Sequence, residues 1–179
     1  VTHKVTGEQI TFLETAAETK GEHLLIEVSL PANGGGPPLH IHDQFEEHFE
    51  VVSGQLTVRV AKEERLLQAG ESLTAPIGVA HTFRNAHSEP VTFRVKLTPP
   101  LQFEQSVRIH YGLMDDGLTD AKGNPKKLAH TALVLSMQNT WVAGIPMWLQ
   151  KKLFAFAIRR GKATNAYDSL EKYIGSKVE

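Results

Sequence analysis

The sequence predicts a mainly β protein, in which a double-sheet jelly-roll barrel over residues 1–100 is followed by an α-helical extension over residues 101–179. Short segments of alternating apolar and polar residues recur up to Leu97, and turns rich in Gly, Pro and Asn separate them. Pro99 and Pro100 then interrupt the pattern, and apolar residues recur beyond them at helical spacing. Many short strands at this interval are typical of an antiparallel sandwich or barrel.

The alternation predicts the strands in chain order. Strands are expected at residues 10–16, 22–30, 40–42, 47–52, 55–62, 66–68, 80–85 and 91–97. The charged run at 62–65 is predicted to be a turn, and residues 71–75 lead to the turn that places His81. The Gly- and Pro-rich segment 31–38 is predicted to be a loop at the mouth of the site.

The extension is predicted to be helical throughout. Helices are expected at residues 102–114, 126–143, 147–160 and, as a short fourth helix, 165–174. The third helix has an apolar stripe formed by Leu149, Leu153 and Phe156. We expect the extension to pack against the barrel or at a dimer interface. A helix lying on a membrane surface is the less favoured alternative.

Composition excludes several classes of function. The chain has 179 residues and a formal net charge of −1, so nothing indicates bulk binding to nucleic acid. It has no cysteine, which excludes disulfides, thiolate ligands and cysteine nucleophiles. Polar residues interrupt the apolar run 126–147, which argues against a transmembrane span. No signal peptide is visible, so a cytoplasmic location is expected, with an earlier removed leader left open.

Three histidines and one glutamate stand at strand spacings in the barrel region. Residues two apart in a strand share a face, so His40 and His42 point the same way. An inward Glu47 takes Phe49 and Val51 with it, and an inward His81 takes Phe83. Imidazole and carboxylate groups are ligands for divalent transition metals. These spacings therefore predict that His40, His42, Glu47 and His81 hold one metal ion inside the barrel.

The same residues resemble the two motifs of the cupin superfamily. The first motif, G-x5-H-x-H-x3,4-E-x6-G, matches the run from Gly34 to Gly54, and the second, G-x5-P-x-G-x2-H-x3-N, matches the run from Gly70 to Asn85. All ten motif positions fit, and fifteen residues separate the motifs, which is similar to the small bacterial, RmlC-like members. The resemblance implies a jelly-roll barrel, metal ligation by the four residues named above, and a homodimer.

Neighbouring residues offer alternatives to this ligand set. Glu46 would suit the shorter form of the first motif, but its distance to Gly54 is then one residue too long, which favours Glu47. His48 points to the opposite face by parity, so a structural or interface position is expected for it. Asn85 is expected to form hydrogen bonds in a turn and not to bind the metal.

The function predicted from these features is that of a metal-dependent oxygenase acting on a small aromatic or apolar molecule. The metal would be Fe, Mn, Ni, Cu, Co or Zn, and Glu47 would be the catalytic base. Phe49, Val51 and Phe83 are predicted to line the pocket, with Phe12 and Phe93 as further candidates. A non-catalytic module that binds or senses a small ligand, and a redox-neutral isomerase, stay open as alternatives because one fold hosts many chemistries.

Overall fold

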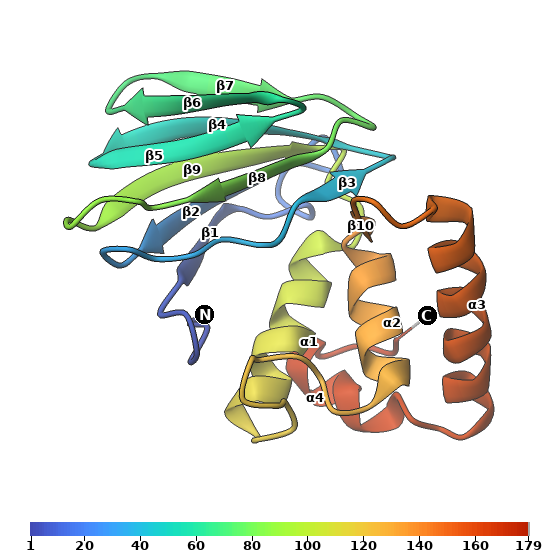
Figure 1. Ribbon diagram of the computed structural model, residues 1–179. Helices are drawn as coiled ribbons and strands as arrows, with labels where there is room; N and C mark the ends of the chain where they lie inside the picture. Colours follow the sequence, from blue (N-terminus) through green and yellow to red (C-terminus); the bar gives the residue numbers. More distant parts are fainter. Residues whose placement is uncertain (179) are drawn as a thin grey trace.

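The computed structural model describes residues 1–178 and contains two antiparallel β-sheets that face each other, with a group of helices at one end (Figure 1). One sheet has the strand order β1-β2-β9-β4-β7 and the other has the order β10-β3-β8-β5-β6. The strands are β1 (Gln9–Glu14), β2 (Leu24–Leu30), β3 (His40–His42), β4 (Glu46–Ser53), β5 (Gln55–Val60), β6 (Glu63–Gln68), β7 (Ser72–Ala75), β8 (His81–Arg84), β9 (Val91–Thr98) and β10 (Thr140–Val142). This arrangement is the jelly-roll barrel that the alternating pattern predicts.

The core lies between the two sheets. Along β2 and β9 every second side chain is buried, and the two strands pair so that Val28 lies opposite Phe93 and Leu24 opposite Leu97. Aligned apolar pairs of this kind are the units that stabilise an antiparallel sheet. Phe49 and Leu56 complete the centre of the core and have no exposed surface. The pattern of alternation in the sequence is thus the pattern of burial in the barrel.

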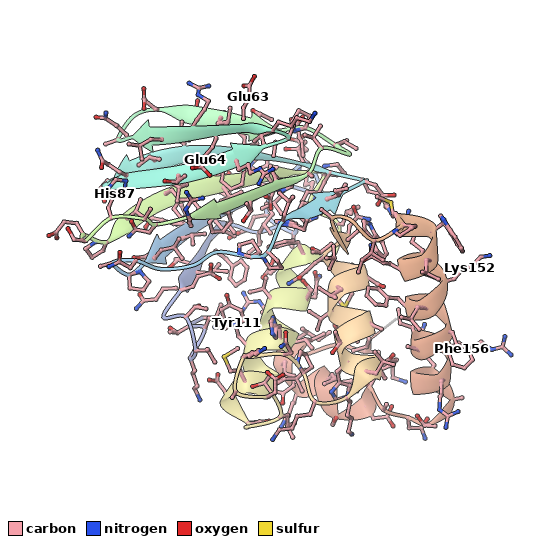
Figure 2. The ribbon with its side chains drawn as sticks, viewed as in Figure 1. Glu63, Glu64, His87, Tyr111, Lys152 and Phe156 are labelled. Carbon is pink, nitrogen blue, oxygen red and sulfur yellow. The ribbon has the colours of Figure 1, made fainter. Side chains whose placement is uncertain are left out.

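The charged segment at 62–65 is a correction to the sequence-based prediction. Strand β6 begins at Glu63, and the turn lies at Ala61 and Lys62, where Ala61 has a φ of 55°. Among the described residues, strand β6 pairs with β5 alone and forms the edge of its sheet, and Glu63 projects into solvent (Figure 2). Charged side chains are common on edge strands because they prevent pairing with other chains. Charge at this position therefore accompanies an exposed strand and not a turn.

The helices of the extension form a separate layer beside the barrel (Figure 1). They are α1 (Phe103–Asp115), α2 (Leu128–Met137), α3 (Met147–Ala163), the 3-10 turn η1 (Asp168–Leu170) and α4 (Glu171–Ile174). The first and third predicted helices are confirmed to within a few residues, whereas the fourth is a 3-10 turn followed by a single helical turn. Within residues 1–178, no helix is long and apolar enough to cross a membrane.

The predicted helix at 126–143 is wrong in its last part. Helix α2 ends at Met137, the chain turns at Asn139 with a φ of 51°, and Thr140–Val142 forms strand β10. Strand β10 pairs with β3, so that Thr140 lies opposite His42 and Val142 opposite His40. The free edge of β3 offers hydrogen-bonding partners that an isolated sequence segment lacks, and β-branched and aromatic residues suit a strand. The extension thus supplies one strand of the barrel.

Helix α3 buries a different side from its apolar stripe. Its buried residues are Gln150, Phe154, Ala157 and Gly161. The stripe residues Leu149, Leu153 and Phe156 are exposed instead, with 47%, 49% and 66% of their surface accessible. The other residues that the structure describes therefore leave about half or more of each of these three side chains uncovered.

Candidate metal centre

The four predicted ligands come together in one buried cluster between the two sheets. His40 and His42 come from β3, His81 from β8 and Glu47 from β4 of the opposite sheet. Each residue is less than a tenth exposed, and one ligand atom from each lies within 4.8 Å of the others. The strand parity used in the sequence analysis explains this geometry, because each of these residues occupies an inward position of its strand.

The backbone at Gly36, just before β3, lies close to the backbone of β8. A Cβ atom on Gly36 would lie 2.2 Å from the carbonyl oxygen of Phe83, so only glycine fits there. Strand β3 then meets β8 through the pair His40 and His81. This glycine lies inside the first motif but is not one of its fixed positions, so the motif alone does not explain it.

Main-chain carbonyl groups orient all three imidazole rings. The Nδ1 atom of His40 lies 2.8 Å from the carbonyl oxygen of Pro38, and that of His81 lies 2.9 Å from the carbonyl oxygen of Val79. The Nδ1 atom of His42 lies 3.0 Å from the carbonyl oxygen of Asn139. A carbonyl oxygen only accepts hydrogen bonds, so each Nδ1 carries a proton and donates it. In the neutral ring, the Nε2 atom then carries the lone pair that binds metals.

The three Nε2 atoms and the carboxylate face one another. The Nε2 atoms of His40 and His42 are 3.1 Å apart, and the Nε2 atom of His81 is 3.1 Å from Oε2 of Glu47. The Nε2 atom of His42 is 3.6 Å from Oε1 of Glu47. Two ligands bound at right angles, each about 2.1 Å from an ion, lie roughly 3 Å apart. The donor set therefore fits one divalent metal ion in both its chemistry and its spacing.

The protonation states of the cluster depend on burial and on the interactions among its four ionisable side chains. Burial, with the nearby His42 and His81, lowers the pKa of His40 to about 4, and burial also lowers the pKa of His42. Burial acts to raise the pKa of Glu47, but the charge of His42 and the hydrogen bond from His81 outweigh it and hold that pKa at about 2. Burial acts to lower the pKa of His81, but the hydrogen bond and charge of Glu47 outweigh it and raise that pKa.

These shifts favour binding of a cation. At neutral pH His40 and His42 are neutral and Glu47 is ionised, which are the forms that ligate a metal. The pKa of His81 is raised, so a metal ion would have to displace the proton in the hydrogen bond between Nε2 of His81 and Oε2 of Glu47. A buried carboxylate also needs a compensating positive charge, and the ion would supply it.

Aromatic side chains form the walls beside the cluster. The ring of Phe45 stacks on His42 with ring centres 4.1 Å apart, a neighbour that the sequence analysis missed. The ring of Phe49 lies 6.4 Å from that of His81 and 5.7 Å from that of Phe83. Val51 is buried in the same core cluster as Phe49. That Phe49, Val51 and Phe83 contact a bound ligand stays a prediction.

The rival residues lie away from the cluster. Glu46 is exposed, whereas Glu47 is buried among the histidines. His48 is on the outer face of β4, where its Nδ1 lies 2.8 Å from the hydroxyl of Thr74. Asn85 is buried and donates hydrogen bonds to the carbonyl oxygens of Pro31 and Glu89, so it is a structural residue of a turn as predicted.

Asn139 is the residue of the site that sequence reasoning missed. Its carbonyl oxygen accepts the hydrogen bond from His42, and its side-chain oxygen accepts hydrogen bonds from the backbone N–H groups of Asp43 and Gln44 at 2.7 and 2.9 Å. The side-chain amide of Asn139 donates to the carboxylate of Asp43 at 2.7 Å. The helical extension therefore holds the strand that carries two of the four candidate ligands. No motif marks Asn139, because its contacts lie 95 to 97 positions away in sequence.

The Asp43 carboxylate links this contact to α3. It also accepts a hydrogen bond from the indole N–H of Trp141 at 2.8 Å and forms an ion pair with Lys151. The hydrogen bonds from Lys151, Asn139 and Trp141 outweigh partial burial and lower the pKa of Asp43. A continuous set of polar contacts thus runs from His42 to α3.

Comparison with known proteins agrees with the two motifs. A family model described as "Cupin domain" matches residues 26–97. Residues 26–97 are a cupin domain. The match includes both motifs and all four residues of the cluster, which confirms the resemblance seen in the sequence.

Several solved structures are similar to about half of this chain. The TT1209 protein from Thermus thermophilus shares 28% identity over 45% of this chain and 75% of its own, with a TM-score of 0.43. A predicted oxalate decarboxylase from Thermotoga maritima shares 16% identity over 51% of this chain and 80% of its own, with a TM-score of 0.49. A sugar phosphate isomerase of the cupin superfamily from Silicibacter pomeroyi shares 22% identity over 51% and 60% of the two chains, with a TM-score of 0.45. No curated protein sequence matches the chain.

Replacing His42 with Ala should reduce the affinity for a divalent metal roughly 100-fold or more, because one of four converging ligands is lost. Metal content after dialysis, measured by elemental analysis, tests this. His48→Ala is the matched control on the outer face of β4 and should leave the metal content nearly unchanged. Full retention of metal by His42→Ala would refute the ligand assignment.

Replacing Asn139 with Ala should weaken metal binding about 10- to 100-fold, because the side chain holds β3 beside the carbonyl group that orients His42. Competition with a chelator measures the affinity. Asn165→Ala is the matched control, since Asn165 has a similar positive φ of 53° but an exposed side chain. Equal affinities of the two variants would mean that the contact does not support the site.

Acid should destabilise the chelator-treated protein as the pH falls from 6.5 to about 4, because the pKa of His40 in the folded state lies below its ordinary value of 6.5. The unfolded chain takes up this proton first, and each such histidine contributes a slope of at most about 1.4 kcal/mol per pH unit. Urea unfolding at several pH values across this interval measures the slope. The slope of the unfolding free energy against pH should be shallower for His40→Gln. An unchanged slope would contradict the lowered pKa of His40.

Proposed function

We propose that this cupin is a metal-dependent oxygenase that acts on a small aromatic or apolar organic molecule. The observation that carries the proposal is the convergence of three oriented Nε2 atoms and one ionised carboxylate in a buried site. When bound, Fe, Mn, Ni, Cu, Co or Zn supplies Lewis-acid chemistry, and a redox-active ion among them also supplies electron transfer. Four protein ligands leave positions for further ligands on a six-coordinate ion.

The protein residues have separate roles in this proposal. His40, His42 and His81 bind the ion through Nε2, and their carbonyl partners keep the rings in place without further reorganisation. Glu47 is the fourth ligand and also the group that accepts a proton from the substrate. Its depressed pKa keeps the carboxylate ionised at neutral pH, which is the form that ligates a metal.

The aromatic walls support an apolar substrate. Phe45, Phe49 and Phe93 are almost fully buried, and Phe83 packs between Phe49 and Phe93 with ring centres 5.7 and 5.2 Å away. Side chains of this kind offer apolar surface and no charged group for a phosphate or a sugar hydroxyl. An aromatic or hydrophobic molecule is therefore the substrate class that this wall chemistry favours.

A ligand-sensing function is the second candidate, and one observation favours it. The polar contacts from His42 through Asn139 and Asp43 to Lys151 join the candidate metal centre to α3. A ligand that displaces β3 would therefore change the contacts of the helical extension. In that case the extension reports occupancy of the site, and no turnover is needed.

The deciding experiment is elemental analysis of protein purified without chelators or affinity-column metals, with dioxygen uptake measured on the same sample. We expect about one redox-active metal ion per chain. We also expect dioxygen uptake that aromatic diols or diketones stimulate and that His42→Ala abolishes. One zinc ion per chain without dioxygen uptake would instead favour redox-neutral chemistry or binding of a ligand without turnover.

Two further outcomes separate the remaining possibilities. A metal-loaded protein without uptake, in which a bound ligand alters hydrogen exchange in β10, would support sensing. Failure to bind any of the six metals after reconstitution would refute both functions, because each depends on the four-residue cluster.

A further inference from the structure

The outer face of α3 is an apolar surface that residues 1–178, the part described by the structure, leave exposed. We define this face by the four exposed apolar residues of α3, Trp148, Leu149, Leu153 and Phe156, together with the exposed Ile145 two residues before the helix. Along α3, Leu149, Leu153 and Phe156 recur four and three positions apart, and Trp148 lies eight positions before Phe156, so these four residues lie on one side of the helix. Trp148 and Phe156 are the most exposed of them, at 61% and 66%. Figure 2 shows Lys152 and Phe156 pointing away from the body of the molecule.

The neighbouring helix extends this surface. Leu128 at the start of α2 is 58% exposed and borders the same groove as Phe156 and Arg160. Helix α3 lies at the outer side of the extension, away from the barrel (Figure 1). The apolar side chains of α3 are therefore accessible to a flat partner along the length of the helix, which is about 25 Å.

Basic residues accompany this apolar face. Helix α3 contains five basic residues and no acidic residue, which are Lys151, Lys152, Arg159, Arg160 and Lys162. The other 162 residues contain 14 of the 19 basic residues and all 20 acidic ones, so their formal charge is −6 while that of α3 is +5. Positive charge is thus concentrated on the element that exposes the most apolar surface.

Most of these basic side chains form no ion pair within the part of the protein that the structure describes. Lys151 pairs with Asp43, but in the part of the chain that the structure describes Lys152, Arg159, Arg160 and Lys162 form no ion pair with an acidic side chain. Lys152 lies over the ring of Trp148 at 5.2 Å. Helical spacing places Lys152, Arg159 and Arg160 on the same side of α3 as the apolar residues. Their side chains are long enough to hold the charge at the level of lipid headgroups while the apolar residues lie deeper.

From this arrangement we propose that the outer face of α3 docks on an anionic lipid bilayer, with its apolar side chains inserted among the lipids and its basic side chains at the headgroups. The exposed side of α3 intersperses Trp, Phe and Leu with Lys and Arg, so it offers both the apolar surface and the positive charge that attract an interfacial helix to anionic lipid. Each basic residue near an anionic surface contributes to the attraction. The proposal takes up the less favoured alternative of the sequence analysis for the outer face of α3, while the extension still contacts the barrel through β10.

Charge also argues against a second copy as the partner. A symmetric dimer through this face would bring together the four cations of each α3 that form no ion pair, and like charges oppose that contact. Contact with the acidic part of another copy would be a heterologous interface, which closes only into rings or continues as a filament. A bilayer with anionic headgroups requires neither arrangement.

The test uses the full chain and two kinds of vesicles, phosphatidylcholine alone and phosphatidylcholine with about one third phosphatidylglycerol. We expect the protein to float with the anionic vesicles only, and salt should weaken the binding. The emission of Trp148 should shift to the blue on binding, and a Trp148→Phe variant gives the background from Trp141, which is buried.

Two variants and one control locate the contact. Phe156→Ser removes the most exposed apolar residue of the face, and a double change of Arg159→Glu and Arg160→Glu reverses two charges. Each should lower partitioning into anionic vesicles about tenfold or more. Ile77→Ser, at a residue of the barrel that is 51% exposed, is the matched control and should bind as the unchanged protein does. Circular dichroism checks that the variants are folded.

Other outcomes would overturn the proposal. Absence of binding to anionic vesicles would do so, as would equal binding of Phe156→Ser and Ile77→Ser. A dimer seen by light scattering that Phe156→Ser dissociates, without vesicle binding, would show that a second copy covers the face. Metal content is measured on the same samples, so failure of membrane docking is distinguishable from failure of the metal centre.

Discussion

Three hydrogen bonds from imidazole Nδ1 atoms to main-chain carbonyl groups are the interactions on which the candidate site depends. They fix the tautomer of each ring, so that three Nε2 atoms face one point. Packing of the buried rings restricts their rotation, and these hydrogen bonds determine which nitrogen of each ring faces the cluster. The remaining structure, from the glycine contact before β3 to the strand that pairs with it, holds these carbonyl groups in position.

One of the three carbonyl groups belongs to the helical extension. Asn139 lies between α2 and β10, and its contact with His42 joins two parts of the chain that the sequence separates into barrel and helices. The extension therefore contacts a candidate ligand directly, through the hydrogen bond from His42 to Asn139 and the pairing of β10 with β3. The same set of polar contacts continues through Asp43 and Lys151 to α3, the helix with the exposed apolar and basic face.

The predictable part of the site has a local cause. Strand parity places His40 and His42 on one face, and motif spacing chooses Glu47 over Glu46, so that the four residues of the cluster follow from short segments of sequence. The errors have a non-local cause. The segment at 62–65 is a strand because it occupies a sheet edge, and β10 leaves its predicted helix because β3 offers an unpaired edge.

By itself, the sequence determined the barrel, its inward-facing residues and the four candidate ligands, because alternation along a strand is a property of neighbouring residues. Only the tertiary structure decided that Asn139 supports His42, that Phe45 stacks on it, and that the stripe of α3 faces outward. Helical periodicity shows that a helix has an apolar side but not which element covers it. That depends on contacts between residues far apart in the chain, which no local pattern records.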